Sequence, residues 1–122
     1  MTIAIKGFII LIALEHLYIL WMEMFGWTTK GKKVFRSLPP DSFESTKAMA
    51  ANQGLYNGFL AAGLLWSLFI NDSMHAMQTA SFFLSCVAIA GIYGAFTIQR
   101  SIFFIQAMPA LIAIVLLWLT HA

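Results

Sequence analysis

Four long apolar stretches constrain the fold more than any other feature of this sequence. A helix of about 20 mainly apolar residues crosses a hydrocarbon core of about 30 Å. Stretches of this kind occupy residues 3–27, 48–70, 76–98 and 102–120. None shows the strict two-residue alternation of a transmembrane β-barrel strand, so each is predicted to be a helix. We therefore expect an all-α fold, a four-helix transmembrane bundle, in a single domain over residues 1–122.

The composition agrees with lipid as the main solvent of the protein. Hydrophobic residues make up 61% of the chain and charged residues 10%, whereas charged residues make up about a quarter of an average soluble chain. The net charge of +2 is too small to indicate nucleic-acid binding. Cys86 is the single cysteine and cannot form an internal disulfide. The expected partner is the lipid bilayer, with no nucleic acid.

The connections between the stretches predict the orientation. The first connection contains a Pro39–Pro40 pair, which interrupts a helix, and most of the basic residues: Lys30, Lys32, Lys33, Arg36 and Lys47. After the proline pair, Asp41 or Ser42 is a candidate cap for a short interfacial helix. The second connection has no Lys or Arg, and the third contains Arg100. Because positive residues favour the cytoplasmic side, a basic cytoplasmic loop is expected between helices 1 and 2. The protein is then a multi-pass protein of the inner membrane with both termini outside the cytoplasm.

Small residues recur at every fourth position in two of the stretches. Gly54, Gly58 and Ala62 follow this spacing in the second, and Gly91 and Ala95 in the third. Such spacing lets two helices approach closely. The sequence favours packing within one chain over contact between two copies, and a homodimer stays open.

Polar residues inside the apolar stretches are the candidate site. Ionisable groups at mid-membrane cost roughly 2.5–3.5 kcal/mol each, so they usually face a bundle interior or a wet cavity. With a rise of about 1.5 Å per residue, the polar residues fall at mid-depth or in the cytoplasmic half. We therefore predict a polar pocket, open to the cytosol, between helices 1 and 2. The candidate residues are Glu15, His16, Glu23, Asn52, Gln53, Tyr56, Asn57, Arg100 and Gln106.

The repeat of the α-helix predicts which of these residues share one face of a helix. His16 and Glu23 are seven residues apart and share a face. On the second helix, Asn52 and Tyr56 form one row and Gln53 and Asn57 the next. Both rows can contact a ligand, or the polar groups can simply bond to one another across the bundle. An ion pair between Glu23 and Arg100 is a further structural alternative.

Three hypotheses follow for the function. In the first, the pocket binds or converts a small lipophilic molecule, with Glu15 as acid or base, His16 tuning it or relaying protons, and the remaining candidates orienting the polar end of the ligand. In the second, the chain is a proton-coupled exporter that uses Glu15. In the third, it is a structural or accessory subunit. The sequence leaves open whether the protein is an enzyme.

No metal site is predicted, and the sequence leaves open whether another cofactor binds. Histidine and carboxylates are metal ligands, but no second histidine and no dense ligand motif lies inside the apolar stretches. His75 and His121 lie in a connection and at the C-terminus, where no site role is expected.

Three sequence strings resemble a known family. They are ALEHLYI (residues 13–19), EMFGW (residues 23–27) and ANQGLYNGFLAAGLLW (residues 51–66). They are similar to a family of small bacterial integral-membrane proteins catalogued as domain of unknown function 1304, and the resemblance covers the whole chain. It implies a four-helix protein of the bacterial inner membrane and no established activity. A weaker likeness, in layout alone, is to small multidrug transporters, which also carry a glutamate in the first of four helices.

Overall fold

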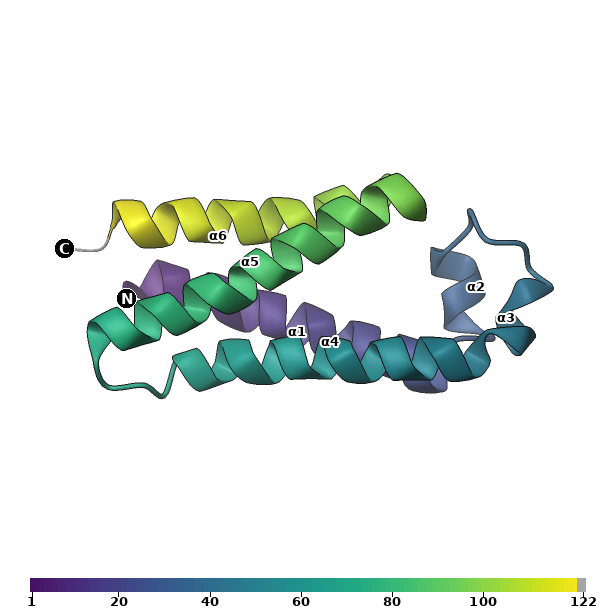
Figure 1. The fold of residues 1–122 in the computed structure, drawn as a ribbon, viewed down its shortest axis with the longest axis horizontal. Helices are drawn as coiled ribbons and strands as arrows, with labels where there is room; N and C mark the ends of the chain where they lie inside the picture. The colour runs from purple at the N-terminus through teal and green to yellow at the C-terminus, as the bar shows by residue number, and fades with distance from the viewer. Residues whose placement is uncertain (121–122) are drawn as a thin grey trace.

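The computed structural model describes residues 1–120, and His121 lies outside the described residues. Every regular element within that range is helical, which confirms the all-α class (Figure 1). The elements are α1 (Ile3–Phe25), α2 (Lys30–Val34), α3 (Ser42–Ser45), α4 (Lys47–Ser67), α5 (Ser73–Thr97), the π-helical turn η1 (Phe103–Ala107) and α6 (Met108–Leu119). The long helices coincide with the four predicted stretches to within a few residues at each end.

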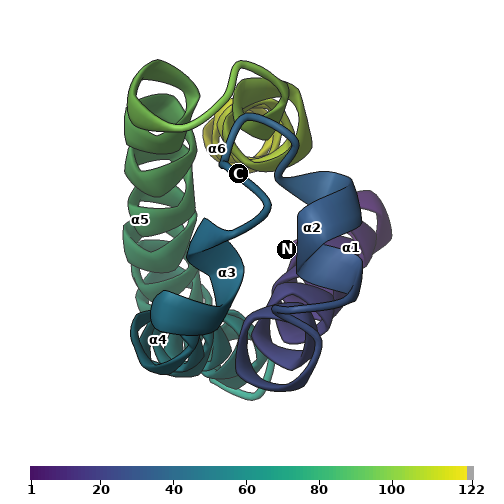
Figure 2. The same cartoon turned by 90° about the vertical axis from the view of Figure 1, so that its right-hand side faces the viewer.

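The four long helices run alternately in opposite directions along the molecule (Figure 1). The N-terminus and the C-terminal end of α6 lie at one end of the molecule, and α2 and α3 lie across the other end (Figures 1 and 2). Side-chain caps begin two of the helices. The hydroxyl of Thr2 accepts a hydrogen bond from the Ile5 amide at 3.3 Å, and Asp72 Oδ2 accepts one from the His75 amide at 2.8 Å. Such caps satisfy amides that have no partner within the helix.

Glycine spacing sets the packing of α1 against α4, the closest pair of long helices. A Cβ atom on Gly54 would lie 3.0 Å from the Leu20 carbonyl oxygen, and one on Gly58 would lie 2.5 Å from Leu20 Cδ1. At Gly54 the neighbour is a backbone atom, so a larger residue would force the helices apart. The predicted packing within one chain is confirmed for Gly54 and Gly58, whereas Ala62, the third residue of the predicted row, is exposed.

A second close approach joins α5 to the last helix. A Cβ atom on Gly91 would lie 2.5 Å from the Ala107 backbone nitrogen. Ala107 ends η1, and Pro109 follows at the start of α6. Proline has no N–H to donate, so Pro109 removes one hydrogen bond of the helix, and the turn just before it is π-helical.

The segment between α1 and α4 is more ordered than the predicted basic loop. Besides α2 and α3 it contains a small aromatic core, in which Trp27, Phe43 and Ala50 are buried and Phe35 and Leu38 pack against them. Trp27 Nε1 donates a hydrogen bond to Thr46 Oγ1 at 3.0 Å. This core explains why α1 ends at Phe25 and not at Trp27, the predicted limit, since Trp27 packs on the following segment.

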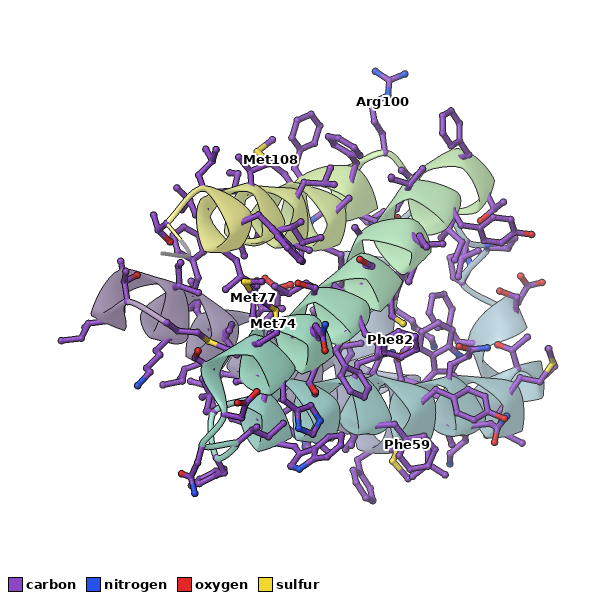
Figure 3. The ribbon with its side chains drawn as sticks, turned by 60° about the vertical axis from the view of Figure 1, so that its left-hand side comes forward. Phe59, Met74, Met77, Phe82, Arg100 and Met108 are labelled. Carbon is purple, nitrogen blue, oxygen red and sulfur yellow. The ribbon has the colours of Figure 1, made fainter. Side chains whose placement is uncertain are left out.

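The outer surface of the long helices is largely apolar. Phe59 on α4 and Phe82 on α5 project outward with 55% and 64% of their surface exposed (Figure 3). Two helices, α1 and α5, are long and apolar enough to cross a membrane, with mean hydropathies of 2.0 and 1.7. The segment Phe103–Leu119 is also apolar but shorter.

The α5–η1 contact gives a test of the packing. Gly91→Ala places a methyl group against backbone atoms of Ala107 that cannot move independently. We expect it to lower the free energy of unfolding in detergent by about 1–3 kcal/mol, the usual cost of overpacking. Gly7→Ala is the matched control, because no atom lies within 4 Å of its added Cβ. Equal stability of the two variants would contradict the close approach.

Candidate functional site

A cavity of about 440 Å³ lies inside the end of the bundle that carries α2 and α3. It forms where α5 diverges from α4 along the molecule (Figure 1). Its walls come from α1, α4, α5 and the start of the last helix. Val34, the last residue of α2, and Phe35, which follows it, also line the cavity. Five of the nine predicted residues line it: Glu15, Glu23, Gln53, Asn57 and Gln106. The cavity thus lies among all four long helices, and not between the first two alone as predicted.

Two carboxyl groups from α1 face this cavity. Glu15 and Glu23 are eight residues apart, which places them about 80° apart around the helix, and both line the cavity. The Oε1 atom of Glu15 is buried and has no hydrogen-bond partner among the described residues. Glu23 Oε1 accepts a hydrogen bond of 2.6 Å from Asn57 Nδ2. One carboxyl is therefore anchored across the α1–α4 contact, and the other retains an unused bonding site.

Asn57 has no donor left for a ligand. Its Nδ2 atom donates to Glu23 Oε1 and, at 3.1 Å, to the Gln53 carbonyl oxygen of the preceding turn. A side-chain amide nitrogen carries two hydrogens, and both are used. Only the Oδ1 acceptor of Asn57 remains.

Gln99 connects the α5–η1 turn to the segment that follows α2. Its Nε2 atom donates to the Val34 carbonyl oxygen at 3.0 Å and to Ser101 Oγ at 2.8 Å, and its Oε1 atom accepts from the Ser37 amide at 3.4 Å. These bonds hold the α2 segment beside the cavity. Sequence reasoning assigned no site role to Gln99, although it is a polar residue at the same end of the bundle as residues 28–47. Tyr18, Tyr93 and Thr97 also line the cavity and were missed.

His16 does not line the cavity. Its side chain is fully buried on the face of α1 that also buries Ile9, Ile12 and Ile19. Its Nδ1 atom donates to the Ile12 carbonyl oxygen at 2.9 Å, and Nε2 has no partner among the described residues. No hydrogen bond joins His16 to Glu15 in the described part of the chain.

Three other candidates also lie outside the cavity. Asn52 and Tyr56 are exposed, because the close approach at Gly54 turns that side of α4 toward α1 and leaves both residues about 160° away around the helix. Arg100 is exposed and projects away from the molecule (Figure 3). The suggested ion pair between Glu23 and Arg100 is therefore wrong, and the partner of Glu23 is Asn57.

No cluster of metal ligands is present in residues 1–120: no three His, Cys, Asp or Glu side chains lie close enough together to hold one ion. The polar groups of the cavity are carboxyls, amides and hydroxyls on an otherwise apolar wall.

Comparison with known proteins assigns the family. The model of the family described as protein of unknown function (DUF1304) matches residues 10–118. The chain belongs to the DUF1304 family. The match includes every residue that lines the cavity. The uncharacterized protein YpaA of Lactococcus lactis subsp. lactis (strain IL1403) is 26% identical over 117 residues, covering 94% of this chain and 97% of that protein. No solved structure matches this DUF1304 chain.

The Glu23–Asn57 hydrogen bond can be tested by a double-mutant cycle. Glu23→Leu, Asn57→Leu and the double variant are compared with the wild type by unfolding in detergent. Because each single variant leaves the other group unpaired, we expect a coupling free energy of about 0.6–1.7 kcal/mol, the range measured for such bonds in membrane proteins. Additive losses of stability would show that the two side chains do not interact.

Proposed function

We propose that the protein crosses the bilayer four times and uses the cavity, in the cytoplasmic half of the membrane, to bind a small lipophilic molecule. The observation that carries the proposal is a cavity of about 440 Å³ whose apolar wall bears a few polar groups from α1, α4, α5 and η1. Sites for small molecules usually have volumes of about 300–1,000 Å³ and this mixture of surfaces.

The outer surface supports a membrane environment for all four long helices. Large apolar side chains are exposed on each of them, for example Phe25 at 74%, Phe59 at 55%, Phe96 at 87% and Leu119 at 77%. Soluble monomers rarely expose contiguous apolar surface on this scale. With 21 residues, α4 is about 31 Å long, enough to cross the hydrocarbon core despite its polar residues.

The distribution of basic residues supports the orientation. Six of the seven Lys and Arg residues lie at the end of the bundle that carries α2, α3 and the cavity; Lys6 is at the other end. The positive-inside rule places the basic end in the cytoplasm. The proposed site is therefore close to the cytoplasmic surface, and both termini are on the other side.

The side chains at the margin of the cavity support access from the bilayer. Tyr93, Ile98 and Ile105 line the cavity and are 70%, 42% and 45% exposed. They belong to the surface that meets lipid in a four-crossing protein. The cytoplasmic end, in contrast, is partly covered by the segment that Gln99 holds in place. A molecule dissolved in the membrane reaches the cavity from the side.

The proposal is limited to binding within a single chain. A transport path must open on both sides of the site, yet a buried apolar cluster that includes Ile5, Ile9, Leu64, Met77 and Leu84 occupies the other half of the bundle. Acid–base catalysis by Glu15 and His16 is not part of the proposal, because His16 lies outside the cavity. One chain forms the whole cavity, so a second copy is not required.

Filling the cavity tests the proposal. Ala90 lines the cavity and Ala62 on α4 does not, although both are exposed. We expect native mass spectrometry of protein extracted from membranes to show a small-molecule adduct on the wild type and on Ala62→Phe. On Ala90→Phe the adduct should be lost, because the phenyl ring occupies the cavity. An unchanged adduct on Ala90→Phe, or none on the wild type, would contradict the proposal.

A further inference from the structure

We infer that the cavity selects lipophilic amines, meaning molecules with a cationic, hydrogen-bond-donating head and an apolar body. The inference rests on the proposed binding function and specifies the class of ligand. Its basis is the charge and the hydrogen-bonding state of the polar groups on the cavity wall, not the number of acidic residues.

The charged groups of the wall all have one sign. Glu15 and Glu23 are the only ionisable acids or bases among the lining residues apart from the phenols of Tyr18 and Tyr93, and no Lys, Arg or His lines the cavity. Arg100, in the turn between α5 and η1, projects away from the molecule (Figure 3). The cavity contains no protein cation, and a carboxylate in an apolar site takes up a proton unless it has a cationic partner. A ligand ammonium group would provide it.

Three side chains of the wall already donate hydrogen bonds within the protein. Asn57 donates to Glu23 and to the Gln53 carbonyl, Gln99 donates to Val34 and to Ser101, and the Thr97 hydroxyl donates to the Tyr93 carbonyl at 2.8 Å. The buried Oε1 acceptor of Glu15 has no partner in the described part of the chain. An ammonium group offers up to three donors and no acceptor, which complements a wall of this kind. A carboxylate ligand would be repelled by Glu15 and Glu23 in their charged forms.

Aromatic rings add to the preference for a cation. Tyr18 from α1, Phe35 from the α2 segment and Tyr93 from α5 line the cavity on different sides. The faces of aromatic rings attract ammonium groups, and their edges and bodies pack against an apolar chain. The wall can thus accept both parts of an amphipathic amine.

A matched set of probes tests the inference. Radiolabelled decylamine, decan-1-ol and decanoate have the same apolar chain and carry a cationic, a neutral and an anionic head. Equilibrium binding to the protein in phosphatidylcholine nanodiscs is measured against empty nanodiscs. We expect saturable binding of decylamine with an affinity roughly ten- to hundredfold above that of decanol, since hydrogen bonds to charged groups are among the strong ones, and weaker binding still of decanoate.

Two variants distinguish the effect of the cavity carboxyl groups on binding from the effect of surface charge. Glu15→Gln/Glu23→Gln should reduce the preference for decylamine to within about threefold of decanol, whereas Glu44→Gln, an exposed acid on α3 outside the cavity, should leave it unchanged. The wild-type ranking of the probes does not depend on how well the double variant folds. If decanol or decanoate binds the wild type as tightly as decylamine and Ala90→Phe abolishes binding of all three, the site exists and the inference about amines is wrong. If no probe saturates the protein, the proposed binding function fails as well.

Discussion

The close packing of α1 on α4 is the contact on which the rest of the architecture depends. Gly54 and Gly58 bring α4 so near to α1 that atoms of Leu20, Glu23 and Met24 lie where Cβ atoms on these glycines would make contact. The contact fixes the rotation of both helices. It turns Glu23 toward Asn57, directs Glu15 and Gln53 into the cavity, and leaves Asn52 and Tyr56 outside. Several polar groups in the middle of an apolar bundle are thus paired or directed into one internal space, whereas His16 is buried outside it.

A second glycine contact, at Gly91, determines where that space lies. It joins α5 to η1 near the end that carries α2 and α3, while α5 diverges from α4 toward the same end (Figure 1). The four helices enclose an apolar core in one half of the molecule and the cavity in the other. The aromatic core around Trp27 and the hydrogen bonds of Gln99 hold the connecting segment over the separated end.

The sequence was sufficient to predict the helices and the end of the molecule at which the cavity lies. Apolar runs of the right length and the clustering of Glu23, Gln53, Asn57 and Gln106 in one half of the bundle carried that information. It was not sufficient to predict helix rotation, since the spacing of Asn52 and Tyr56 defines a row as clearly as the spacing of Gln53 and Asn57 does. Which row faces inward depends on the glycine contact, a tertiary feature.

The structure of the connecting segment was predicted only in part: a short helix was expected at Asp41 or Ser42, where α3 begins, but α2 and the aromatic core were not. Residues 28–47 are basic and contain a Pro–Pro pair, which is typical of an exposed loop. In the structure, Trp27 and Phe43 pack together at 4.8 Å between ring centroids, and two short helices form around them. These contacts join residues far apart in the segment and leave no periodic signal. The role of Gln99 depends in the same way on a partner more than 60 residues away.

The central claim is a four-crossing protein whose cavity lies at the cytoplasmic end, and labelling of single cysteines in cells tests it most directly. In a Cys86→Ser background, Ser37→Cys marks the end that carries the cavity and Asn71→Cys marks the turn between α4 and α5; both positions are exposed. A membrane-impermeant maleimide should modify Asn71→Cys in intact cells, and Ser37→Cys only after the membrane is permeabilised. Modification of Ser37→Cys in intact cells, or the same response at both positions, would contradict the account.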